Sequence, residues 1–177
     1  MEKLDLELSK AQQLLLMTDG SVTTLLEVIT GKPVVVTTLL QQVVEADAER
    51  ASALDVEEGD NINYRVVVLK NDDNHQPLIY AESYTPIARL KKEFRHDLMK
   101  ADIPIGRIMN QRKIESRREI RRIEIVCNEE VSELFGVAQS VPLLSRTYDI
   151  ISHDTVLIRI TETFPSTSFA HTAMEMP

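Results

Sequence analysis

The chain has 177 residues, of which 43% are hydrophobic and 27% charged, and its formal net charge is −8 at pH 7. This length and composition predict one globular domain, residues 1–177, with enough chain to bury a core. The acidic balance argues against nucleic acid as a partner, because phosphate backbones attract basic surfaces. No apolar run approaches the roughly 20 residues of a membrane span. With Cys127 as its single cysteine, the chain cannot form an intrachain disulfide, and we expect a cytoplasmic protein.

Hydrophobic periodicity and turn residues divide the chain into alternating helical and extended segments. In chain order they are helices over 3–17 and 22–29, a strand over 33–44, a turn and weak helix within 45–60, a hairpin over 64–86, helices over 87–100 and 103–112, a strand over 120–127, a helix over 129–136 and a hairpin over 145–165. The tail after Pro165 is expected to fray. No strand–helix–strand unit carries a Gly-rich turn, so the order predicts an α+β fold with helices on an antiparallel sheet.

The hairpin over 145–165 places an acidic residue on an apolar strand face. Alternate side chains of a strand share a side, so Ile158, Ile160, Glu162 and Phe164 lie together. A carboxylate in that position is paired, kept protonated by desolvation, or directed into a ligand cavity.

Residues 64–86 repeat the order of this second hairpin, with an arginine before an apolar strand and a glutamate near the end. Arg65 corresponds to Arg146 and Glu82 to Glu162, with a spacing of 17 residues in the first copy and 16 in the second. We interpret the pattern as a degenerate duplication, and we expect the two hairpins to form the middle of one sheet.

No pattern of metal-binding or nucleophilic residues stands out. The four histidines are scattered, and no His, Cys, Asp or Glu cluster has metal-ligand spacing, so no metal is expected. No Ser-His-Asp arrangement can be assigned, and Cys127 is predicted to be a small core residue. The basic run Arg112–Arg122 has two interpretations, a solvated surface or one or two arginines that face a cavity and attract a polyanionic substrate.

Arg65 and Glu162 are the best candidates for a functional pair. One hypothesis is purely structural, with salt bridges across the sheet from Arg65 to Glu82 or from Arg146 to Glu162. The other is a ligand site, because arginine binds a carboxylate with two hydrogen bonds and a buried glutamate with a raised pKa can exchange a proton near neutral pH. That combination suits a carboxylated, partly apolar small molecule.

Four fragments, in the same order and at compatible spacings, resemble the chorismate pyruvate-lyase family (4-hydroxybenzoate synthases), and more closely its divergent archaeal and bacterial branch. They are DGSVTTLLE (19–27), YRVVVL (64–69), IPIGRIM (103–109) and TETFP (161–165). The resemblance implies a six-stranded antiparallel sheet with helices on one side and helical flaps over an internal cavity. It also implies a lyase that converts chorismate to 4-hydroxybenzoate and pyruvate with no cofactor.

The same resemblance implies ligand contacts at Val22, Arg65, Ile105 and Glu162, with Glu162 as the catalytic residue. Val22 replaces a methionine and Ile105 a leucine, and both keep an apolar wall. Glu82 stands where the well-studied bacterial enzymes carry an arginine, so the electrostatics of the cavity are expected to differ.

Two alternatives remain beside the chorismate lyase. The segment NHQPLIYAESYTP (74–86) resembles the effector-binding domains of bacterial transcription regulators, although the residues before Tyr64 match the lyase-type start rather than a winged helix. The chain is then a stand-alone module that binds a small carboxylate, or a lyase that acts on a related enolpyruvyl compound. In each case the expected partner is a small-molecule carboxylate, and the protein is a monomer or homodimer.

Overall fold

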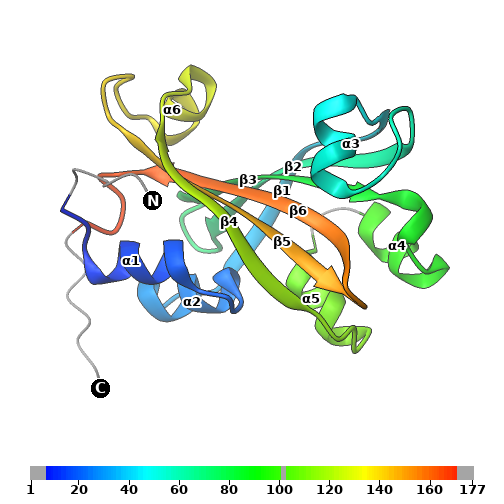
Figure 1. Cartoon of the computed structure of the whole chain (residues 1–177). Helices are drawn as coiled ribbons and strands as arrows, with labels where there is room; N and C mark the ends of the chain where they lie inside the picture. Colours follow the sequence, from blue (N-terminus) through cyan, green and yellow to red (C-terminus); the bar gives the residue numbers. More distant parts are fainter. Residues whose placement is uncertain (1–6, 101–102, 171–177) are drawn as a thin grey trace.

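A computed structural model describes residues 7–100 and 103–170 of the chain. Its centre is one antiparallel sheet in the strand order β1-β2-β3-β6-β5-β4 (Figure 1). The six strands are β1 (Val34–Glu45), β2 (Asn61–Asn71), β3 (Pro77–Pro86), β4 (Arg117–Val126), β5 (Leu143–Ser152) and β6 (Thr155–Pro165). The predicted α+β class and six-stranded antiparallel sheet are confirmed.

Several helices are shorter than the sequence pattern predicts. They are α1 (Lys10–Met17), α2 (Val22–Thr30), α3 (Ala48–Leu54), the 3₁₀ turn η1 (Ile87–Arg89), α4 (Lys92–Met99), α5 (Ile105–Gln111) and α6 (Glu129–Phe135). The helix predicted over 3–17 begins only at Lys10, because Ser9 and Gln12 form a capping box; residues 3–6 lie outside the described residues. The helix predicted over 87–100 is divided into η1 and α4.

The sheet consists of two three-stranded halves joined along β3 and β6. As predicted, the two hairpins form its middle. In the strand register, Arg65 of β2 lies opposite Ser83 of β3, whereas Arg146 of β5 lies opposite Glu162 of β6. The proposed correspondence of Glu82 with Glu162 is therefore wrong, because a shift of one residue moves a side chain to the opposite face.

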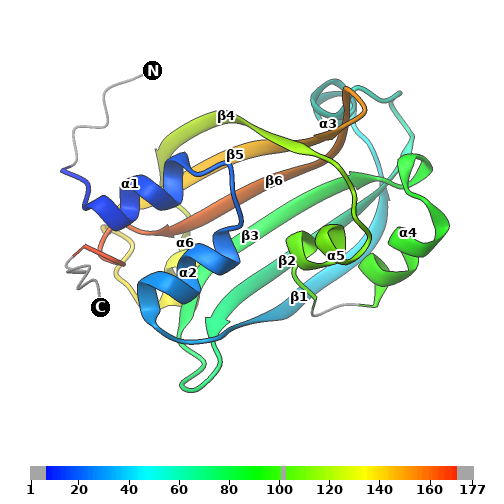
Figure 2. The same ribbon diagram turned by 90° about the horizontal axis from the view of Figure 1, so that it is seen from below.

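Helices cover both faces of the sheet, whereas the resemblance implied helices on one side. Figures 1 and 2 show α1, α2 and α5 across one face, where apolar residues of α1 and α2 pack on the central strands. Phe94 of α4 and Ile108 of α5 extend this cover over β5 and β6. The other face carries α3, packed through Ala51 and Leu54, and α6 (Figure 1). Among the described helices, none is long and apolar enough to cross a membrane.

The segment after β6 is held in place. Gln12 Nε2 donates to the carbonyls of Ser166 at 2.7 Å and Ser168 at 2.8 Å, and Phe169 packs edge-on against Phe164. The predicted fraying is therefore wrong for residues 166–170, and residues 171–177 lie outside the described residues. Cys127 is exposed rather than buried in the core, because it follows the last residue of an edge strand.

Candidate functional site

A cavity of about 70 Å³ lies between the sheet and the starts of α2 and α5. It is lined by all four residues expected to contact a ligand, Val22, Arg65, Ile105 and Glu162. Val22 and Ile105 are the first residues of α2 and α5, and they supply apolar walls opposite the sheet. These four residues are far apart in the chain, and the antiparallel sheet with its two covering helices brings them together.

Glu162 is held on β6 by two side chains of the neighbouring strand β5. Its carboxylate accepts a hydrogen bond from Arg146 Nε at 2.8 Å and another from the Tyr148 hydroxyl at 3.1 Å. Glu162 is only 6% exposed, and both donors are buried. The Arg146–Glu162 salt bridge, one of the two structural pairings considered from the sequence, is therefore present. A carboxylate has about four acceptor positions, so lone pairs of Glu162 remain for a ligand.

Arg146 and Tyr148 form a rigid support for this carboxylate. The Arg146 guanidinium lies 4.8 Å from the centre of the Tyr148 ring, and its Nη1 donates to the carbonyl of Thr18 at 2.9 Å. Burial raises the pKa of Tyr148, and the neighbouring Glu162 raises it further, so its hydroxyl stays a donor at neutral pH. Sequence reasoning overlooked Tyr148, although its position two residues after Arg146 places it on the same strand face.

Arg65 approaches the cavity from β2 and is 2% exposed. Its Nη2 donates to Thr38 Oγ1 at 3.4 Å and to the carbonyl of Ile103 at 3.2 Å, so it connects β1 to the segment that leads into α5. Arg146, rather than Arg65, is the arginine that Glu162 pairs with among the described residues.

Glu82 lies on the other face of the sheet. It accepts hydrogen bonds from the hydroxyls of Tyr64 at 3.0 Å and Tyr80 at 2.8 Å. Burial raises the pKa of both tyrosines, and the neighbouring Glu82 raises it further. The suggested Arg65–Glu82 salt bridge is therefore excluded, and Glu82 does not alter the electrostatics of the cavity through direct contact.

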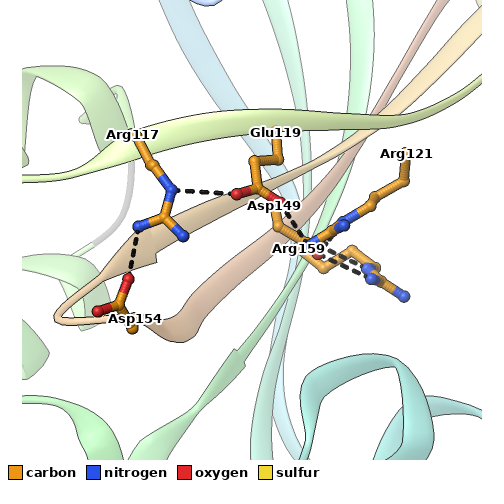
Figure 3. Close-up of polar contacts among 6 residues, drawn as sticks. All are labelled: Arg117, Glu119, Arg121, Asp149, Asp154 and Arg159. Carbon is orange, nitrogen blue, oxygen red and sulfur yellow. Dashed lines mark hydrogen bonds and ion pairs between the residues drawn. The ribbon is translucent and has the colours of Figure 1, made fainter.

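The basic run divides between the two faces of β4. Arg118 lines the cavity and donates through Nη1 to the carbonyl of Asp19 at 3.1 Å. Figure 3 shows the other face, where Arg117 pairs with Glu119 and Arg121 pairs with Asp149. Arg117 and Arg121 therefore lie on a solvent-exposed face, as the first interpretation predicts, and Arg118 faces the cavity; attraction of a polyanionic substrate stays a prediction.

Two guanidiniums and one carboxylate line the cavity. Arg65, Arg118 and Glu162 are its charged lining residues, and Arg146 behind Glu162 balances the one carboxylate. Ser21 caps the start of α2, and Ser21, Val22 and Thr23 line the cavity, so the helix end that carries partial positive charge lies at the cavity wall. Within 7–100 and 103–170, no group of three or more His, Cys, Asp or Glu side chains is placed to hold a metal ion.

The fold is thus a six-stranded antiparallel sheet with a cavity beneath the helices on one face. The sequence model of the chorismate pyruvate-lyase Rv2949c-like family matches residues 16–171. A protein of Methanocaldococcus jannaschii named "Putative lyase MJ0807" is 37% identical over 158 residues, which are 86% of this chain and 77% of that protein. The chain belongs to the chorismate pyruvate-lyase Rv2949c-like family.

Solved structures with this fold include regulator domains. PhnF from Mycobacterium smegmatis is 15% identical with a TM-score of 0.72, and the match covers 86% of this chain and 66% of that chain. The C-terminal domain of the histidine utilization repressor from Pseudomonas syringae is 16% identical with a TM-score of 0.63, covering 76% of this chain and 93% of that chain. At such identities the likeness concerns the fold alone.

Proposed function

We propose that this protein eliminates pyruvate from chorismate and leaves 4-hydroxybenzoate. Membership of a chorismate pyruvate-lyase family supports this reaction type. The observation that carries the proposal is Glu162, a buried carboxylate that two neighbouring side chains hold at the wall of a cavity also lined by Arg65.

The chemistry requires little beyond a fixed geometry. Chorismate carries a carboxylate on a cyclohexadiene ring, an enolpyruvyl ether at C3 and a hydroxyl at C4. The C4–H and C3–O bonds break, and the C4–H electron pair completes the aromatic ring. The enolpyruvate takes up a proton at its methylene carbon to become pyruvate, which balances the proton lost from C4. No electron acceptor or co-substrate enters this balance, so the protein mainly holds the elimination geometry and excludes water.

Arg65 and Glu162 take complementary roles. The planar guanidinium of Arg65 binds the ring carboxylate through two parallel hydrogen bonds. Glu162 uses its remaining lone pairs to accept a hydrogen bond from the C4 hydroxyl, which directs electron density toward the ring as the enolpyruvyl group departs. Val22 and Ile105 contact the ring from the helical side and keep water from the reacting bonds.

Substrate entry requires the cavity to widen. Its volume of about 70 Å³ holds only a few water molecules, whereas pockets for drug-sized ligands usually measure about 300–1,000 Å³. The start of α5 closes one side and is tied to Arg65 through the carbonyl of Ile103. A substrate carboxylate that replaces this carbonyl as the acceptor of Arg65 would release α5 to move outward, as expected of a flap.

The alternative function is a stand-alone carboxylate-binding module, which the fold shared with regulator domains favours. A third candidate is a lyase for a related enolpyruvyl compound. A ligand that binds only the folded chain raises its melting temperature, so a panel of chorismate, 4-hydroxybenzoate and sugar phosphates separates these classes. A shift with chorismate but no products supports the module, and a shift with sugar phosphates alone supports an effector-type domain.

The test of the lyase is incubation of the purified protein with chorismate, with both products measured over time. We expect equal amounts of 4-hydroxybenzoate and pyruvate. Glu162→Gln should lower kcat by about 100-fold or more, because it removes the charged acceptor of the C4 hydroxyl in the transition state. Arg65→Ala should lower kcat/KM by about 10- to 100-fold, because a charge-assisted hydrogen bond is lost.

Glu82→Gln is the matched control, since Glu82 resembles Glu162 in sequence but lies on the other face. It should react at the wild-type rate. Wild-type rates in both Glu162→Gln and Arg65→Ala would remove the proposed site.

A further inference from the structure

Arg118 supplies the second guanidinium of the cavity lining, and it enters from the edge of the sheet that β4 forms. Arg65 lies on β2 and Arg118 on the edge strand β4, with β3, β6 and β5 between them. Neighbouring strands are about 4.8 Å apart, so their backbones are separated by about 19 Å measured across the sheet. The two side chains therefore reach the cavity from opposite sides.

Unlike its neighbours on β4, Arg118 has no acidic partner among the described residues. Arg117, Arg121 and Arg122 each form an ion pair with a carboxylate. The hydrogen bond to the carbonyl of Asp19 is the one bond of Arg118 within the described part of the chain, where its buried Nε has no partner. A guanidinium at a cavity wall with unused hydrogen-bond donors can bind an anion.

The guanidinium of Arg118 also lies where the two covering helices meet. A Cβ added to Gly106 of α5 would stand 3.6 Å from Arg118 Nη2 and 4.0 Å from Ser21 Oγ at the start of α2. The N-terminal end of α2, with its partial positive charge, and the Arg118 guanidinium thus lie at the same end of the cavity.

We infer that Arg118 binds the second carboxylate of a dicarboxylate substrate. The inference rests on the proposed function, because chorismate carries one carboxylate on its ring and one on its enolpyruvyl arm. Arg65 is the proposed contact of the ring carboxylate, and Arg118, whose buried Nε has no partner among the described residues, supplies a guanidinium for the other carboxylate. Glu162 lies on β6, between the strands of these two arginines, and faces the bonds that break between the two anchored ends.

This arrangement makes the site selective. A dicarboxylate can engage both guanidiniums, whereas a monocarboxylate engages one. After the elimination each product carries a single carboxylate, and neither product spans Arg65 and Arg118. The loss of the two-point attachment favours product release.

The test measures binding by titration calorimetry with two unreactive probes, benzene-1,3-dicarboxylate and benzoate. The wild type should bind the dicarboxylate about 10- to 100-fold more tightly than benzoate. Arg118→Gln should lose most of this preference by weakening the dicarboxylate alone, with the affinity for benzoate unchanged. The control Arg122→Gln, an exposed arginine on the same strand that pairs with Glu124, should behave as the wild type.

Arg118→Lys is the second variant. It should bind the dicarboxylate with intermediate affinity, because it keeps the charge but loses the planar guanidinium that donates two parallel hydrogen bonds. Absence of a preference in the wild type, or an equal effect of Arg118→Gln on both probes, would overturn the inference. Turnover of chorismate is measured separately, so a missing lyase activity with an Arg118-dependent preference would count against the proposed function and not against this assignment.

Discussion

Glu82 and Glu162 differ by a single position in their repeats, and that position decides which face of the sheet they occupy. The connection between β2 and β3 spans residues 72–76, whereas two residues, His153 and Asp154, join β5 to β6. Turn length sets the register of a hairpin, and a register change of one residue reverses every side chain. Each hairpin also contains one register shift, between Leu69 and Lys70 in the first and between Ile150 and Ile151 in the second, so the Arg-to-Glu spacings of 17 and 16 alone do not decide which glutamate faces its arginine.

Tyr148 gives a prediction at the scale of one hydroxyl group. Tyr148→Phe removes a hydrogen bond to Glu162 and should lower the free energy of unfolding by about 1 kcal/mol at pH 7. The pKa of Tyr148 is raised in the folded chain. As the pH rises above the ordinary tyrosine pKa of about 10, the unfolded chain therefore loses this proton while the folded chain still keeps it. The stability that depends on this group is present below that pH and is lost as the pH rises above it.

Urea unfolding between about pH 9.5 and pH 11 measures this effect. The wild type should lose stability more steeply than Tyr148→Phe, by up to about 1.4 kcal/mol per pH unit. Below about pH 9 the two curves should run parallel. Equal slopes above pH 10 would mean that the Tyr148 hydroxyl is not buried against Glu162.

Strand β4 shows why a run of arginines cannot be assigned from composition. Simple alternation separates Arg118 from Arg117, but the register shifts between Ile120 and Arg122, so Arg121 is an extra residue in the ladder. Such a bulge lets Arg121 and Arg122 both leave the cavity face. The sequence could predict a strand here, but the position of the bulge depends on pairing with β5.

Asp149 tests the ion-pair network on that outer face. It is fully buried and accepts hydrogen bonds from Arg121 Nε and Arg159 Nε, each at 2.7 Å (Figure 3). Asp149→Asn removes the charge that both arginines face, and we expect a loss of about 2–3 kcal/mol in urea unfolding. The control Asp154→Asn changes a carboxylate that is 90% exposed and should leave stability unchanged. Equal effects of the two substitutions would contradict the network.

For the whole molecule, local patterns predicted the two hairpins, the central sheet and most helices, because periodicity and turn residues act over short stretches. The resemblance to a family located Val22, Arg65, Ile105 and Glu162, which line one cavity. The Arg146–Glu162 pair was only one of two hypotheses, because the facing residues of the second hairpin depend on a register shift between Ile150 and Ile151 that the sequence does not reveal. The way the two halves of the sheet join along β3 and β6 decides instead that Arg65 and Glu162 line the same cavity, and no single segment encodes it.

The most direct test of the whole account is the structure of a crystal soaked with chorismate. We predict a planar aromatic ring in the cavity, its carboxylate on Arg65 and its phenolic oxygen within hydrogen-bond distance of Glu162, with α5 displaced outward. A ring bound elsewhere on the molecule, or unconverted chorismate seated in the cavity, would contradict the claim that these two residues bind and split this substrate.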